Sequence, residues 1–186
     1  MTWRISRLAL ASSLSLAALA CGDPGAISGG NCPITEDQLN GNVIIESDYD
    51  CAFQTVDFAG GVDVKPGATV RLKDGTVAGD FQAADAGALQ LEHVTVHGNL
   101  QASSGADVSL VSLDVSGNIQ LENNEGSMTI RGNEVSGNIE LKGQKGTSVV
   151  ERNVAGGNLT CEGNDPAPSG GENAAAGTKQ GQCSGL

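Results

Sequence analysis

Cysteine is the residue type in this chain best able to do chemistry, because a thiol can be acylated, oxidised to a disulfide or used as a metal ligand. The chain has five cysteines, an odd number. If Cys21 has a separate role, the other four form two local pairs, Cys32 with Cys51 and Cys161 with Cys183. We expect two disulfides, each closing a loop of about 20 residues and stabilising the fold by roughly 3 kcal/mol. Metal binding is the less favoured alternative, because there is no CxxC motif and the two pairs lie far apart.

Cys21 directly follows a segment with the features of a signal peptide. Residues 1–7 are basic, and residues 8–20 are an apolar run of Leu, Ala and Ser that is too short to span a bilayer comfortably. The residues Ala18-Leu19-Ala20 before Cys21 resemble the lipobox of bacterial lipoproteins, although Ala18 stands where that family favours Leu. The resemblance implies lipidation of Cys21, for example with palmitate. The alternative is an ordinary secretory signal cut near Ala20, which would leave Cys21 as a free thiol.

A lipid on Cys21 makes a membrane the first expected partner, since two or three acyl chains hold a protein on a bilayer essentially permanently. The next residue is Gly22 rather than Asp. By resemblance to the sorting rule of enteric lipoproteins, this implies the outer membrane if the source is Gram-negative, and otherwise an extracellular location. Residues 21–31 have the composition of a flexible tether. We therefore expect a signal peptide at 1–20, a lipidated tether at 21–31 and a folded domain at 32–186.

The remaining titratable residues form no recognisable catalytic or metal-binding pattern. His93 and His97 would converge on a helix but need not do so on strands and turns, and no third ligand lies near them. Asp48, Asp50 and Asp57 are the densest acidic group, which solubility explains as well as a weak calcium site does. No serine lies in a nucleophile motif. We expect no catalytic residue, no metal and no cofactor.

The composition limits both the core and the partners. The chain has 186 residues, of which 27 are glycine and only 3% are aromatic, so we expect a core of small aliphatic side chains in a regular pattern. The net charge is −12, and it becomes −14 without residues 1–20, with eight basic against 22 acidic residues. Such a surface repels phosphate backbones and anionic headgroups, so nucleic acid is not an expected partner.

The middle of the chain is a repeat with a period of 19 or 20 residues. One column of the repeat is polar or glycine and is always preceded by glycine and followed by an apolar residue. Its members are Asn42, Gly61, Asp80, Asn99, Asn118, Asn138 and Asn158. A second column, eight residues earlier in each repeat, is apolar and consists of Phe53, Leu72, Leu91, Leu110, Ile130 and Val150. Apolar and polar positions alternate with a period of two, which is typical of strands.

This pattern predicts an all-β, single-domain parallel β-helix of about seven to eight coils, each coil being one repeat. The period also suits leucine-rich repeats, but their LxxLxLxxN framework is missing. The constant glycine lets the chain turn where a Cβ would clash. The asparagines Asn42, Asn99, Asn118, Asn138 and Asn158 are predicted to form an internal ladder of side-chain amides that bond the coils above and below.

Both ends of the predicted solenoid have features of caps, which a stack of strands needs to avoid polymerising. Cys32-Pro33 and the first disulfide close the N-terminal coil, and Lys179 replaces the aliphatic residue in the last repeat. The Gly-Asn-apolar repeats, together with the segments 161–168 and 179–183, resemble a group of small secreted bacterial right-handed parallel β-helix proteins. This resemblance covers residues 31–186 and implies the fold, including its handedness, but no activity.

Two functions are compatible with these observations. The first is a non-catalytic lipoprotein of the cell envelope, a rigid structural, adhesion or binding scaffold whose partner is an envelope protein or a glycan. The second is a minimal or degenerate carbohydrate-active enzyme of the polysaccharide lyase type, favoured only by analogy of fold. The first is preferred, because repeats that vary by a single residue leave little loop length for a cleft.

Overall fold

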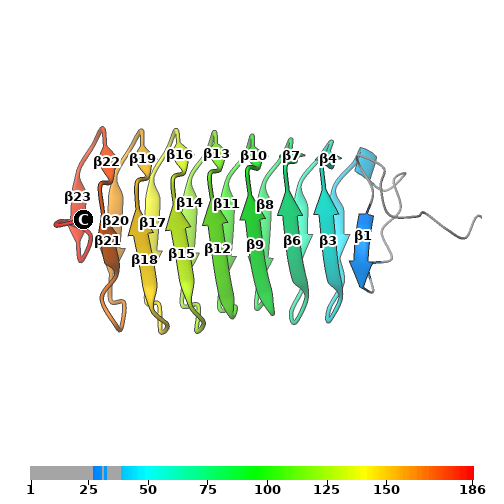
Figure 1. Ribbon diagram of the computed structural model, residues 1–186, viewed down its shortest axis with the longest axis horizontal. Coiled ribbons are helices and arrows are strands. Elements are labelled where there is room, and N and C mark those ends of the chain that lie inside the picture. Colours follow the sequence, from blue (N-terminus) through cyan, green and yellow to red (C-terminus); the bar gives the residue numbers. More distant parts are fainter. Residues whose placement is uncertain (1–26, 31, 33–38) are drawn as a thin grey trace, which may run out of the picture.

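The computed structural model describes residues 27–30, 32 and 39–186, and in these residues the chain is a parallel β-solenoid of about seven coils (Figure 1). Each coil contributes one strand to each of three sheets that run the length of the rod. Apart from the antiparallel strand β1, neighbouring strands in every sheet are parallel. The all-β solenoid predicted from the repeat is confirmed.

The three sheets differ in strand length. Sheet A is eight-stranded and consists of β1 (Ile27–Gly30), β3 (Asp50–Gln54), β6 (Thr69–Lys73), β9 (Ala88–Glu92), β12 (Asp107–Val111), β15 (Met128–Arg131), β18 (Ser148–Glu151) and β21 (Ser169–Gly171). Sheet B is eight-stranded and consists of β2 (Val43–Ile45), β5 (Val62–Val64), β8 (Phe81–Ala84), β11 (Leu100–Ser103), β14 (Ile119–Glu122), β17 (Ile139–Lys142), β20 (Leu159–Glu162) and β23 (Lys179–Gly181). Sheet C is seven-stranded, with two residues per strand: β4 (Asp57–Phe58), β7 (Thr76–Val77), β10 (Thr95–Val96), β13 (Asp114–Val115), β16 (Glu134–Val135), β19 (Val154–Ala155) and β22 (Ala174–Ala175).

The alternation in the sequence decides which side chains enter the rod. In β6, Val70 and Leu72 are buried while Arg71 and Lys73 are exposed. The predicted apolar column is one stack of side chains, since Phe53, Leu72, Leu91, Leu110, Ile130 and Val150 are register partners on successive coils. Because identical positions stack directly, each aliphatic side chain buries its neighbours above and below, and the core is continuous along the rod.

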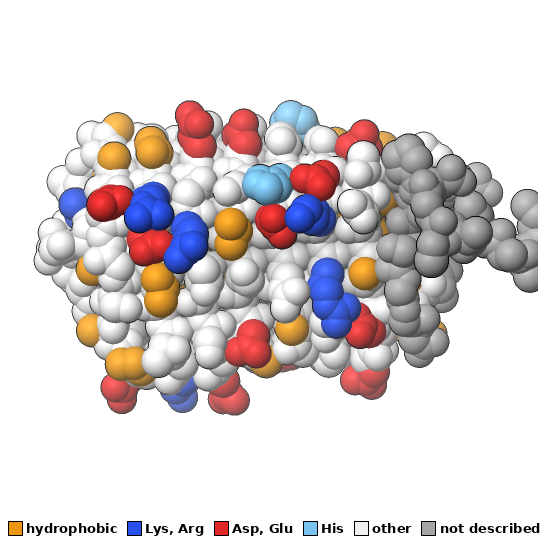
Figure 2. Space-filling view, viewed as in Figure 1, with side chains coloured by type: hydrophobic (Ala, Val, Ile, Leu, Met, Phe, Trp, Pro, Cys, Tyr) orange, Lys and Arg blue, Asp and Glu red, His pale blue; other side chains and the backbone are white. Residues whose placement is uncertain are grey.

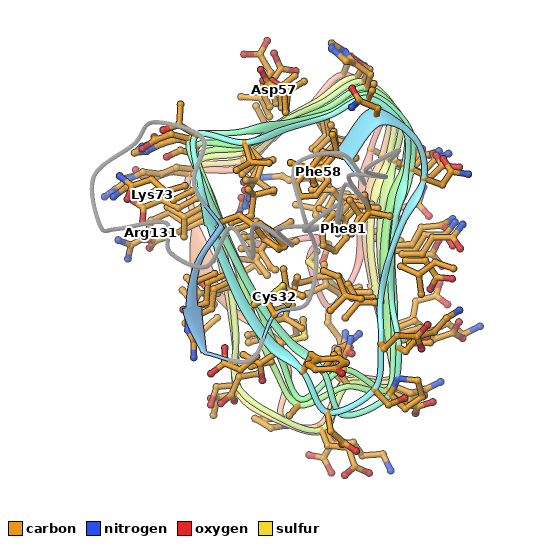
Figure 3. All side chains as sticks on the ribbon, turned by 90° about the vertical axis from the view of Figure 1, so that its right-hand side faces the viewer. Cys32, Asp57, Phe58, Lys73, Phe81 and Arg131 are labelled. Carbon is orange, nitrogen blue, oxygen red and sulfur yellow. A yellow bond between two sulfur atoms is a disulfide. The ribbon has the colours of Figure 1, made fainter. Side chains whose placement is uncertain are left out.

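The core is aliphatic, as expected from the composition, except at its N-terminal end. All three phenylalanines lie there and are almost fully buried, and the rings of Phe53 and Phe58 meet edge to face with centroids 5.2 Å apart. Figure 3, viewed along the rod, shows Phe58 and Phe81 inside the coils and Asp57, Lys73 and Arg131 outside them. The first coils therefore have the bulkiest interior.

The corner after each strand of sheet A uses one residue in the left-handed region. The residues at this corner have φ between 53° and 63°: Thr55, Asp74, His93, Ser112, Gly132, Arg152 and Glu172. The N–H of each of the first six donates to a carbonyl of the next coil, for example Ser112 to Arg131 at 2.9 Å. Only one of the seven is glycine, so the corner bonds compensate a conformation that other residues rarely adopt.

The N-terminal end is closed by a disulfide and by an antiparallel strand. Cys32 is bonded to Cys51, and β1 pairs with β3 through Ile27 opposite Phe53 and Gly30 opposite Cys51. Residues 27–30 fall in the segment expected to be a flexible tether, but they form this strand instead. A reversed strand cannot continue a parallel stack, so β1 covers the edge of sheet A.

The C-terminal end is closed by the tail of the chain. Cys161 is bonded to Cys183, and both are fully buried. The side chain of Leu186 packs against the core, and Lys179, which pairs with Leu159 in register but is exposed, donates to the carbonyl of Leu186. We call residues 179–186 the C-terminal cap. The two expected disulfides are thus present, and they indicate an oxidising compartment such as the cell envelope or the extracellular space.

Candidate functional site

The predicted asparagine column stacks in register, but it lies at the surface. In the corner between sheets C and B, each side-chain oxygen accepts the backbone N–H of the same position one coil later. The distances run from 2.7 Å between Asn138 Oδ1 and Asn158 N to 3.0 Å between Asn99 Oδ1 and Asn118 N. Asn42, Asn99, Asn118, Asn138 and Asn158 are all exposed or half-buried.

The prediction that this ladder is internal is therefore wrong. The physical reason is the alternation itself: the residue after each asparagine, such as Ile119 after Asn118, points into the core, so the asparagine points away from it. The preceding glycine has the expected role. A Cβ on Gly98 would lie 2.7 Å from the carbonyl oxygen of Gly79 on the previous coil, so close backbone stacking excludes a side chain there.

Two other columns form the internal ladders, both in the C-terminal half. One consists of Asn133, Asn153 and Asn173, and the other of Asn124, Gln144, Asn164 and Gln182. Apart from Gln182 at the end, all are buried, and among the described residues no buried side-chain nitrogen or oxygen lacks a hydrogen-bond partner. Sequence reasoning missed them, although Asn133 continues by 20 residues a column of Val56, Val94 and Leu113. These ladders are structural.

The outward face of sheet A carries most of the basic side chains and is the candidate functional site. Its outermost residues form a column in register, which we call the charge column: Lys73, Glu92, Val111, Arg131 and Glu151. Figure 3 shows Lys73 and Arg131 projecting from the same side of the rod. Because these positions belong to a continuous sheet, the side chains start from fixed points along the rod, one per coil.

The charged side chains gather in two clusters, separated by the neutral coil of Val111 and Ser112. Figure 2 shows this face, with charged groups on either side of an apolar side chain. In the first cluster, Lys73 Nζ lies 3.1 Å from Glu92 Oε1, and His93 Nδ1 lies 3.4 Å from Asp74 Oδ1.

In the second cluster, Arg131 Nε lies 2.6 Å from Glu151 Oε1, and Arg152 Nε lies 2.9 Å from Glu172 Oε2. These pairs join consecutive coils. The pKa of Arg152 is raised, mainly by its hydrogen bond to Glu172 and by the charges of Glu172 and Glu151. Both clusters remain largely exposed, so their pairs contribute little to stability and stay accessible to a partner.

A surface hollow of about 380 Å³ lies beside the first cluster. Its polar lining includes Arg71, Lys73, Gln90, Glu92 and Ser109, and Leu72 and Leu91 contribute to its floor. Arg71 is held by Asp50 on the previous coil, with Nη2 at 3.2 Å from Oδ2 and Nη1 bonded to Oδ1. The hollow therefore combines an apolar floor with cationic and amide donors, which suits a contact with a polar partner surface.

The Arg71 guanidinium lowers the pKa of Asp50 through their hydrogen bonds, and Asp50 raises the pKa of Arg71. A lowered folded-state pKa contributes stability above the unfolded value, near 3.9, and that stability is lost as the pH falls through the folded pKa. We expect Asp50→Asn to reduce the free energy of unfolding at pH 7 and to have a shrinking effect below about pH 4. Urea unfolding from pH 2 to 7 measures this, and in an Arg71→Gln background the Asp50→Asn effect should disappear; a pH-independent effect in that background would contradict the pairing.

The outward face of sheet B offers a second surface. Gln101 donates to Gln120 across two coils at 3.0 Å. A hollow of about 440 Å³ lies over Gly61, where the surface ladder lacks a side chain, and Ile44, Asp63 and Gln82 line it. Ile44 is 50% exposed. This face has fewer cations than sheet A and no clusters of linked ion pairs in the described part of the chain.

The remaining predicted residues contribute nothing to this site. Cys21 lies outside the described residues. His93 belongs to the first cluster, while His97 follows the sheet C strand β10 and is exposed. Within residues 27–30, 32 and 39–186, no group of three or more His, Cys, Asp or Glu is placed to hold a metal ion. In the same part of the chain, no helix has the length and apolar character needed to cross a membrane.

The geometry defines the class of protein as a disulfide-closed parallel β-solenoid with charged ladders on an outer face. Comparison with known proteins adds no family to this description. No protein-family model matches the chain, and neither a curated protein nor a solved structure is significantly similar to it.

Proposed function

We propose that this protein is a non-catalytic binding scaffold of the cell envelope, anchored by a lipid on Cys21. The observation that carries the proposal is the register of the sheet A face, where the charge column repeats one residue per coil on a continuous backbone. Such a face presents its groups to a partner with little loss of backbone freedom on binding.

The ends of the rod support a tethered role. The N-terminal disulfide and β1 lie at one end and the C-terminal cap at the other (Figure 1). Cys21 precedes Cys32 by 11 residues, so an anchor there holds the N-terminal end near the bilayer. A lipid at this point leaves the outward faces of all three sheets free.

Fractionation of cells that produce the wild-type chain and the Cys21→Ser variant tests the anchor. We expect the wild-type protein in the membrane fraction, released by detergent but not by salt, and the variant in the soluble fraction, because loss of the acyl chains removes the membrane affinity. Equal partition of both proteins into the soluble fraction would refute the anchor. The matched control is Ser28→Ala in the same segment, which should stay with the membrane.

A further inference from the structure

The charge column has an order that is complementary to itself when reversed. From the N-terminal end, it runs cation, anion, apolar, cation, anion: Lys73, Glu92, Val111, Arg131 and Glu151. Val111 is the midpoint, with two charged coils on each side. A second rod laid antiparallel across this face, with its Val111 opposite the first, places opposite charges against each other at every charged position.

The facing pairs follow from the register. Lys73 meets Glu151 of the second copy, and Glu92 meets its Arg131. At the adjacent corner, Asp74 lies at the same coil as Lys73, and Arg152 at the same coil as Glu151, so Asp74 meets Arg152. By the two-fold symmetry each contact occurs twice, which gives six new pairs of opposite charge in one dimer.

The parallel arrangement is excluded by the same column. With equal coils facing each other, each of Lys73, Glu92, Arg131 and Glu151 would meet its own kind, and like charges in close contact are strongly unfavourable. The pattern thus selects one orientation as well as one face. Sheets B and C have no charge column of this kind among the described residues, since their ion pairs are Lys65 with Asp63 and Lys142 with Glu122, both on sheet B.

The shape of the face agrees with this docking. Val149 lies in the central column of sheet A, in register with Thr129, Ser109, Gln90 and Arg71. Antiparallel pairing about the central coil sets Val149 of one copy opposite Arg71 of the other, over the hollow lined by Arg71, Gln90 and Ser109. Apolar side chains therefore meet at the centre and enter a hollow on each side, while charges surround them, as in protein interfaces generally.

We infer that the sheet A face is a homophilic interface, on which two copies of this chain bind antiparallel. The N-terminal ends then lie at opposite ends of the pair. If the chain is anchored as proposed above, copies on two facing membranes would bind in trans, so the adhesive reading rests on the proposed function, while the interface itself does not.

Sedimentation velocity tests the interface on the full chain carrying Cys21→Ser, purified after export so that both disulfides form. We expect a reversible monomer–dimer equilibrium, and Arg131→Glu should weaken the dimer about tenfold or more, because the reversed charge faces Glu92 twice. Lys142→Glu on sheet B changes the net charge equally and breaks an equivalent ion pair with Glu122, so it is the matched control and should leave the dimer unchanged. A monomer at all concentrations up to about 1 mM, or equal effects of both variants, would overturn the inference.

Inversion of the whole column separates recognition from folding. A variant with Lys73→Glu, Glu92→Lys, Arg131→Glu and Glu151→Arg keeps every intramolecular pair and its own complementarity. We expect it to dimerise with itself but not with the wild-type chain, and free mixing of the two would overturn the proposed pairing.

Cysteine cross-linking reports the orientation. Gln90→Cys and Thr129→Cys lie one coil on either side of Ser109, so a mixture of the two single variants should cross-link and Gln90→Cys alone should not. The reverse result would contradict the antiparallel arrangement. A soluble chain that dimerises would refute the anchor alone, and an anchored chain that stays monomeric would refute the interface alone.

Discussion

Replacement of Asn153 by alanine is expected to lower the free energy of unfolding by about 4 kcal/mol, because it breaks an internal ladder at its middle. Asn153 Oδ1 accepts both the N–H and the Nδ2–H of Asn133, at 3.1 and 2.9 Å, and its own Nδ2 donates to Ile130 O and Asn173 Oδ1. Alanine leaves two donors of Asn133 buried without an acceptor, and each such donor costs roughly 1–3 kcal/mol.

Asn138→Ala is the matched control, because it removes an amide from the surface ladder one corner away. Asn138 Oδ1 accepts only the N–H of Asn158, at 2.7 Å, and the site is exposed. Water can replace that acceptor, so we expect a loss of about 1 kcal/mol. Urea unfolding of the two variants measures the difference, and an equal or greater loss for Asn138→Ala would show that the internal and surface ladders have been assigned wrongly.

Removal of the C-terminal disulfide is expected to destabilise the rod by about 3 kcal/mol and to promote association at that end. The double variant Cys161→Ser with Cys183→Ser avoids a free thiol. It releases the segment that holds Cys183 in the core and Leu186 against it. Beyond this cap lie β21, β22 and β23, whose outer edges pair with no further strand in the described chain, so opening the cap leaves apolar side chains next to unpaired backbone groups.

Denaturant unfolding and sedimentation velocity measure the two effects together. Stacking of ends is open and continues into chains of rods, whereas pairing through the sheet A face closes at two copies. We therefore expect species larger than a dimer for the C-terminal variant. Cys32→Ser with Cys51→Ser is the comparison at the other end, where β1 still covers sheet A, and it should show the loss of stability with less association. An unchanged unfolding midpoint for the C-terminal variant would contradict its role as a cap.

The solenoid could be predicted from the sequence because its repeat is local and regular. The glycine before each column position marks where coils touch, and the alternation around it marks which residues are inside. The apolar column through Leu91 and Leu110 was identified for the same reason: stacked identical positions produce a spacing that can be counted. The two disulfides followed from the same spacing, because residues 19 and 22 apart lie on adjacent coils.

The corners and the ladders were harder to predict, because they depend on bonds between coils. Thr55 and Arg152 adopt positive φ only because their N–H groups find carbonyls on the next coil, and neither residue type signals such a conformation. Asn133 interrupts an apolar column, so its sequence position indicates a surface, yet three stacked amides satisfy each other inside. The strand formed by residues 27–30 was missed because glycine and serine resemble a linker unless an edge of sheet is there to receive them.

The sequence by itself determined the coil, its period, the side of each strand that faces the core, and the pairs of cysteines, because each of these is written in residue spacing along one coil. The tertiary structure alone decided which polar column is buried and where the charges of different coils meet. Charges that are 19 or 20 residues apart become neighbours only when the coils stack in register. The order of the charge column on sheet A, and with it the proposed homophilic face, exists only at that level.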